Sequence, residues 1–171
     1  METHQFIDQE EAPKRRPVFL TVLGILTFVS TGFGVIGLLI SLVTGPSSND
    51  EVEKVVAQSM QSVNELRDMG ATYMADQMEK IARMNIYINE NFYMMLMANF
   101  VTLIFGIAGV ILMWRGRRLG FHSYIIYNIL SILGIYVTVP AEDVPSLMII
   151  MGVIFSTVFI FMYSRNLKWM K

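Results

Sequence analysis

The chain has 171 residues, of which 54% are hydrophobic and 16% charged, and this composition is too apolar for an ordinary water-soluble domain. A formal net charge of -1 provides no basic surface for phosphates, so we expect no nucleic-acid partner. Cysteine is absent, which excludes disulfides, thiolate metal sites and a cysteine nucleophile.

Charged residues are confined to short zones between four long apolar runs. No Asp, Glu, Lys or Arg occurs in residues 18–49, 91–114, 119–141 or 144–164. Each run holds about 20 mainly apolar residues, enough to cross a hydrocarbon core of about 30 Å as a helix. The sequence therefore predicts an all-α membrane protein, and we place its four transmembrane helices at residues 17–44, 92–114, 119–139 and 146–164.

The chain begins with a polar tail, residues 1–16, which has too few apolar residues to fold alone. The first span contains the pattern G-x-G-x-x-G at Gly32, Gly34 and Gly37. This pattern binds dinucleotides only where a strand leads into a helix N-terminus. Because apolar residues flank it on both sides, we interpret the glycines as helix-packing residues and expect no cofactor.

Small residues form a row along each of the first two spans. Their spacings of three and four place them on one helix face, where they allow a neighbouring helix to approach closely. The row on the first span consists of Thr27, Ser30, Gly34, Gly37 and Ser41, and the row on the second of Ala98, Thr102, Gly106 and Gly109. We therefore predict that these two spans pack against each other as a close antiparallel pair.

Residues 45–91 are predicted to be an external amphipathic helical segment with a break near Gly70. Ser48 and Glu51 have the spacing of a capping box at its start. The sequence does not decide whether the two helices form a hairpin or lie separately on the membrane surface. No Gly or Pro separates residues 71–105, so we expect the second helix to enter the second span without a break.

A basic cytoplasmic turn, residues 115–118, leads into the third span, which has the most polar face of the four. Tyr124, Asn128 and Ser131 share this face at positions i, i+4 and i+7. Two interpretations remain open: interhelical hydrogen bonds that stabilise packing, or a polar path through the bundle.

An acidic external turn, residues 140–145, precedes the fourth span, and a basic cytoplasmic tail, residues 165–171, ends the chain. Within the fourth span, Gly152 and Ser156 have the small-xxx-small spacing of a helix contact.

The basic residues predict the orientation. Of the 13 Lys and Arg, three precede the first span, three lie between the second and third spans, three follow the fourth span, and four lie in residues 45–91. The nine in short segments all fall on one side, which the positive-inside rule assigns to the cytoplasm. We therefore expect both termini inside and the external segment outside.

Residues suited to catalysis or metal binding are missing from the predicted spans, which contain no charged side chain. His122 lies near the membrane face opposite the acidic pair Glu142 and Asp143, so a hydrolase triad is not expected. The acids of residues 45–91 lack the spacing of a calcium loop, and the methionines lack a repeated cluster for Cu(I). We predict no catalytic, metal or cofactor site.

Residues 16–28, which read RPVFLTVLGILTF, and the four-span layout resemble small uncharacterised bacterial four-helix membrane proteins. The resemblance covers the first span and the overall layout and brings no active residue with it. It implies an integral protein of the bacterial inner membrane.

These features predict a non-enzymatic structural or accessory subunit that acts through its external segment. We expect its partners to be membrane lipid and either a second copy of the chain or another membrane protein. The alternatives are a small oligomeric channel or transporter that uses the polar face of the third span, and third a lipid-acting membrane enzyme.

Overall fold

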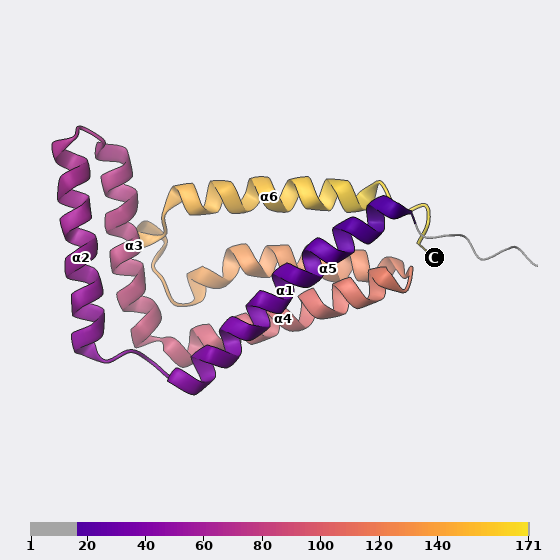
Figure 1. Cartoon of the computed structure of the whole chain (residues 1–171), viewed down its shortest axis with the longest axis horizontal. Coiled ribbons are helices and arrows are strands. Elements are labelled where there is room, and N and C mark those ends of the chain that lie inside the picture. The colour runs from indigo at the N-terminus through magenta and orange to yellow at the C-terminus, as the bar shows by residue number, and fades with distance from the viewer. Residues whose placement is uncertain (1–16, 171) are drawn as a thin grey trace, which may run out of the picture.

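The computed structural model describes residues 17–170, and every regular element in that range is a helix (Figure 1). The elements are α1 (Val18–Thr44), α2 (Asn49–Asp68), α3 (Thr72–Glu90), α4 (Phe92–Trp114), α5 (Arg118–Leu133), η1 (Gly134–Val137), η2 (Ala141–Asp143) and α6 (Ser146–Ser164). The predicted polar tail, residues 1–16, lies outside the described residues.

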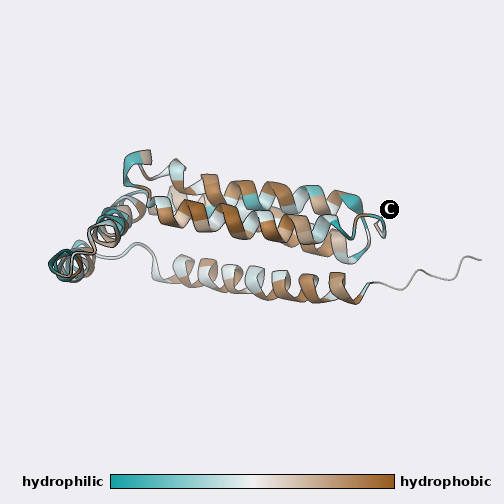
Figure 2. Cartoon of the chain, turned by 90° about the horizontal axis from the view of Figure 1, so that it is seen from above, coloured by the Kyte–Doolittle hydropathy of each residue, from teal (hydrophilic) through white to brown (hydrophobic). Residues whose placement is uncertain are grey.

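Within residues 17–170, four helices are long and apolar enough to cross a membrane: α1, α4, α5 extended by η1, and α6. The predicted all-α membrane fold, with four such helices and a helical segment between the first two, is therefore confirmed. α1 packs on α4, α4 on α5 and α5 on α6, while α2 and α3 form a hairpin that lies crosswise at one end of the bundle (Figure 1). Polar residues gather in the hairpin and at the opposite end, and apolar residues cover the length between (Figure 2).

The closest helix contact in the bundle is between α4 and α5, where two glycines oppose each other. A Cβ atom on Gly109 would lie 3.0 Å from the backbone nitrogen of Tyr124. A Cβ atom on Gly120 would overlap the backbone nitrogen of Met113 and lie 2.8 Å from the carbonyl oxygen of Gly109. The two backbones therefore touch directly, which is the use of small residues at membrane helix contacts.

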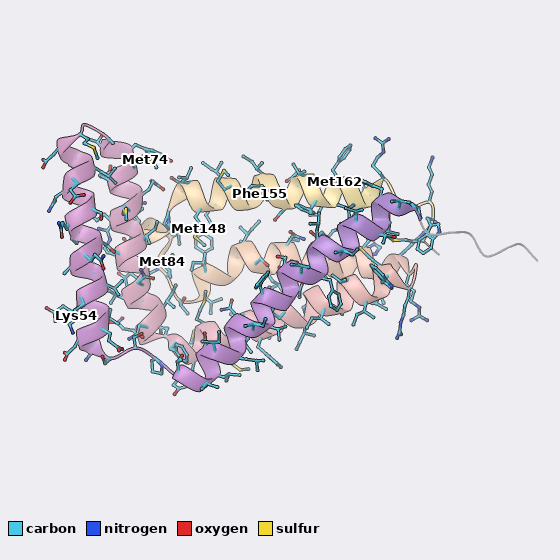
Figure 3. The ribbon with its side chains drawn as sticks, in the orientation of Figure 1. Lys54, Met74, Met84, Met148, Phe155 and Met162 are labelled. Carbon is cyan, nitrogen blue, oxygen red and sulfur yellow. The ribbon has the colours of Figure 1, made fainter. Side chains whose placement is uncertain are left out.

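Two apolar clusters hold the bundle at its two ends. The cluster at the end opposite the hairpin contains Leu20, Leu23, Met113, Phe121, Tyr124, Tyr163 and Met170. The second cluster, beneath α3, centres on Ile135, Val139 and Val144 and includes Met84, which points from α3 toward the bundle (Figure 3). Leu20 and Met170 share the first cluster, so the two ends of the described chain lie at the same end of the bundle.

One expectation about the helices was wrong. The chain does not run unbroken from α3 into α4, because Asn91 leaves the helical conformation at φ -108° and ψ 31° and α4 departs in a new direction (Figure 1). The Asn91 side-chain nitrogen donates to the Tyr87 carbonyl at 3.0 Å, which stabilises the bend without any Gly or Pro. The third span is α-helical only to Leu133, after which a 3-10 helix continues to Val137.

The contact between α4 and α5 can be tested by adding one methyl group. Gly120→Ala should lower the free energy of unfolding in detergent by about 3 kcal/mol, because the new Cβ meets backbone atoms that cannot move aside. Gly32→Ala is the matched control, since a Cβ atom at Gly32 has no neighbour within 4 Å. Equal stability of the two variants in an unfolding titration would contradict this packing.

Candidate functional site

The hairpin is built from sequence signals at its start and at its turn. The Ser48 side chain accepts a hydrogen bond from the Glu51 backbone at 3.3 Å, and the Glu51 carboxylate accepts one from the Ser48 backbone at 3.0 Å. Gly70 has φ +77°, a left-handed conformation that glycine adopts without strain, and it reverses the chain between α2 and α3. The segment is thus a hairpin that also lies across the bundle end, which combines the two arrangements the sequence left open.

α3 is fastened to the start of α6 by a buried glutamine. α6 begins after Pro145, which has no side-chain cap of its own. The Gln77 side-chain oxygen accepts hydrogen bonds from the Leu147 backbone at 3.1 Å and the Ser146 hydroxyl at 3.2 Å. Gln77 therefore caps α6 from another helix, satisfying a backbone donor that the first turn leaves open.

Next to this cap, an ion-pair network joins both hairpin helices to the acidic turn. Arg83 donates from Nε to Asp143 at 2.6 Å and from its terminal nitrogen to Glu79 at 2.6 Å. Arg67 on α2 donates to the other oxygen of Glu79. Only 11% of the Asp143 side chain is exposed, so this pair is shielded more than an ordinary surface salt bridge.

The network shifts the protonation of its members. The hydrogen bond from Arg83 lowers the pKa of Asp143 below its usual value, and hydrogen bonds from Arg83 and Arg67 lower the pKa of Glu79. Asp143 also accepts from Tyr87, which raises the pKa of that phenol. Because both carboxyls bind protons less readily in the docked state, their stabilisation is present above about pH 4 and is lost as the pH falls through their lowered pKa values.

The row of small residues on α1 meets α4 over only part of its length. The Thr27 hydroxyl lies 2.8 Å from the Tyr163 hydroxyl of α6, which joins α1 to α6 at the end of the bundle opposite the hairpin. A Cβ atom on Gly34 would lie 2.8 Å from the Leu103 side chain of α4. Ser30 is exposed, and a Cβ atom on Gly37 would have no neighbour within 4 Å, so these two residues do not pack against α4 as predicted.

The row on α4 also divides between partners. A Cβ atom on Gly106 would lie 3.5 Å from the Thr31 side chain of α1 and 2.8 Å from the ring of Tyr127 on α5. Thr102 donates to the Ala98 carbonyl of its own helix at 2.8 Å. Gly109 faces α5 instead of α1, because the α4–α5 turn brings Gly120 against it.

On α5, two of the three residues of the polar face bond within their own helix, whereas Tyr124 also makes a side-chain hydrogen bond to Thr27 of α1. Asn128 is buried and donates to the Tyr124 carbonyl at 2.7 Å, and Ser131 donates to the Tyr127 carbonyl at 2.8 Å. Both bonds stay within α5. The ring centroid of Tyr124 lies 4.8 Å from that of Tyr163, and Tyr124 belongs to the apolar cluster at the end opposite the hairpin.

On α6, the small pair has a looser environment than its spacing suggests. A Cβ atom on Gly152 would lie 3.7 Å from Ile132, which is ordinary contact distance, and Ser156 is half-buried. Phe155, between them and midway along the helix, is exposed (Figure 3). The helix is held mainly at its ends, by Gln77 and Tyr163.

Because α1 leaves α4 beyond Gly34, a crevice opens between α1, α4 and α5 in the half of the bundle next to the hairpin. Its volume is about 400 Å³. The crevice is lined by Gly34, Gly37, Leu38, Ser41, Leu96, Asn99, Thr102, Leu103, Tyr127 and Ser131. It brings together members of all three predicted sets, namely both small-residue rows and the polar face of α5.

A second hollow of about 360 Å³ lies where α1, α2 and α3 meet outside the apolar zone. Its lining includes Ser41, Glu51, Asn85 and Asn89. Ser41 lines both hollows, so the crevice and this outer pocket adjoin. Neither lining contains a histidine or a lysine, and within residues 17–170 no group of three His, Cys, Asp or Glu side chains is placed to hold a metal ion.

Comparison with known proteins gives no relative: no family model, curated protein or solved structure matches the chain. The site is therefore interpreted from its own geometry.

Sequence reasoning missed Gln77, Arg83 and Asp143 as the residues that dock the hairpin. Gln77 and Leu147 are 70 positions apart, and the helical period of α3 gave no reason to single out one polar residue. Gly120 was also missed, although its place four residues after Gly116, beyond a tight turn, was a usable signal for close packing.

Acid should release α3 from the bundle. Because the chain has no cysteine, Gln58→Cys and Met148→Cys introduce unique exposed sites for spin labels on α2 and α6. We expect a narrow distance distribution at neutral pH that broadens below about pH 4, where Asp143 and Glu79 take up protons. Asp143→Asn should broaden the distribution already at pH 7. A narrow distribution in that variant at pH 7 would show that the ion pair does not hold the hairpin.

Proposed function

We propose that the protein is a non-enzymatic integral membrane subunit that binds another protein through the outward face of α2. The observation that supports this most directly is that the two helices of the hairpin have different contacts. α3 is docked on the bundle by Gln77, Arg83 and Met84, whereas α2 packs mainly on α3. The rest of the α2 surface is exposed and held in a fixed orientation, as an interaction surface requires.

The charge of α2 favours a protein partner with a basic surface. Between Asn49 and Asp68 there are five acids and two bases, a net charge of -3. One of the bases, Arg67, is already paired with Glu79. An acidic surface is repelled by anionic lipid head groups and attracts basic protein surfaces.

We further propose that the protein lies in a bacterial inner membrane with both termini in the cytoplasm. The support is the positive-inside distribution of Lys and Arg together with the common location of Leu20 and Met170 at one end of the bundle. The hairpin then faces the outside, where the acidic charge of α2 favours another membrane protein with a basic surface as the partner over a second copy of the chain.

A channel or transporter is the second candidate, and the crevice is the observation in its favour. Tyr127 and Ser131 bring the polar side of α5 to this crevice. The crevice narrows, however, where Gly34 meets Leu103 and Gly106 meets Tyr127 and Thr31. Transport would therefore need this contact to open, and loss of solute flux in liposomes carrying the Ser131→Leu variant is the measurement that would support it.

Reversing the charge of α2 tests the proposed partner surface. In the triple variant Glu53→Lys, Glu65→Lys, Asp68→Lys, recovery of cross-linked partner proteins should fall about tenfold, because attraction becomes repulsion. The matched control, Glu53→Asp, Glu65→Asp, Asp68→Glu, keeps every charge and should retain the partners. Deleting residues 50–90 while preserving membrane insertion should abolish recovery. Full recovery of all partners by the charge-reversed protein would refute the proposal.

A further inference from the structure

The crevice and the outer pocket adjoin at Ser41 and together extend from the spans to the hairpin. The crevice lies among the spans, and the outer pocket lies under α2, beyond the last turn of α1. Ser41 lines both. At the inner end, the contact of Gly34 with Leu103 and the ring of Tyr127 over Gly106 close the crevice. A molecule in this site therefore has one part among the transmembrane helices and another at the membrane surface.

We propose that this site binds an uncharged, hydroxyl-bearing lipid such as diacylglycerol, with an acyl chain in the crevice and the head group in the outer pocket. The proposal is independent of the protein-binding surface on α2. It rests on polar groups in both linings that lack partners, on an outer-pocket lining without Lys or Arg, and on the size of the crevice.

The crevice lining has polar groups at membrane depth that make no side-chain hydrogen bond within residues 17–170. They are the Asn99 amide, the Tyr127 hydroxyl and the Ser41 hydroxyl. Such groups have no water to bind in the hydrocarbon region, and an unsatisfied polar group there is costly. The ester carbonyls of a diacylglycerol, at the outer end of the crevice, supply acceptors for the Ser41 hydroxyl and the Asn99 amide, while Leu38, Leu96 and Leu103 contact its acyl chain and its free hydroxyl lies in the outer pocket.

The outer pocket selects against a phosphate head group. Hydroxyl and amide groups line it together with the apolar side chains of Val52, Val55, Ile88 and Phe92. Glu51 is its one charged side chain, and its lining contains no Lys or Arg. A phosphate would lie beside a carboxylate without any cation to compensate, whereas phosphate sites normally provide Arg or Lys. Asn85 lines the pocket and makes no side-chain hydrogen bond within the described chain, so its amide is available to a hydroxyl.

The size of the crevice favours a lipid chain over a partner helix. One turn of an α-helix, about 10 Å across with a pitch of 5.4 Å, occupies about 420 Å³. The crevice of about 400 Å³ therefore holds at most one turn.

Photo-cross-linking of the full-length protein in phosphatidylcholine nanodiscs tests the proposal. The probe is a diacylglycerol with a diazirine in one acyl chain, compared with a phosphatidic acid that carries the same chain. We expect diacylglycerol adducts concentrated on the crevice segments of α1 and α4, residues 37–44 and 96–103, and few adducts from phosphatidic acid. Adducts spread evenly over all lipid-facing helices, or equal labelling by both probes, would overturn the proposal.

Two glycines of α1 provide a matched pair of variants. A Cβ atom at Gly37 or at Gly32 has no neighbour within 4 Å, so Leu is tolerated at both, but only Gly37 lines the crevice. Gly37→Leu should lower the adduct yield about tenfold and Gly32→Leu should not. In the outer pocket, Asn85→Leu should weaken diacylglycerol binding about threefold to tenfold through loss of a hydrogen bond.

Equal yields from the Gly37 and Gly32 variants would contradict the site. Cross-links between two copies of the chain at crevice residues, in place of lipid adducts, would assign the crevice to a protein contact and also overturn it. None of these variants changes an acid on α2, so the lipid site and the protein-binding surface can fail separately.

Discussion

The docking of α3 across the end of the bundle is the constraint on which the outer half of the molecule depends. Gln77 caps α6, and Arg83 joins the turn before α6 through Asp143. These contacts hold α3 crosswise to the spans, and α2 takes its orientation from α3 because the two form one hairpin. The bend at Asn91 belongs to the same constraint, since α3 can lie across the bundle only if the chain turns before α4 begins.

The four spans pack tightly at the end of the bundle opposite the hairpin and loosely next to the hairpin. Gly109 and Gly120 bring the backbones of α4 and α5 together, and the hydrogen bond between Thr27 and Tyr163 ties α1 to α6. Beyond Gly34, α1 has no such contact with α4 and leaves the crevice open. Small residues that pack a helix in one half of the membrane thus line a hollow in the other half. This difference in packing explains how a protein without buried charges in its spans still has a site with polar groups.

Much of the fold could be predicted because its signals are local. Gaps between charged residues mark the four spans, Ser48 and Glu51 mark the start of α2, and Gly70 marks the turn. The errors arose where the sequence carries no local signal or where distant contacts decide the structure. At Asn91 the side chain bonds to the Tyr87 carbonyl and stabilises the bend, and no Gly or Pro marks this position in the sequence. The spacing of Gly34 and Gly37 placed them on one face, but the length over which α4 follows that face is set by how the helices cross. Likewise, eight acids in residues 45–91 and two in the turn gave no means of selecting Asp143 as the partner of Arg83.

The central claim is that the pairing of Arg83 with Asp143 holds the hairpin on the bundle, and exchanging the two charges tests it most directly. Backbone hydrogen exchange should show α3 protected in the parent protein and exposed in Arg83→Asp or Asp143→Arg alone, because each single variant places like charges together. The double variant restores opposite charges, and the account predicts that protection of α3 returns. Protection that survives in both single variants, or that fails to return in the double variant, would contradict it.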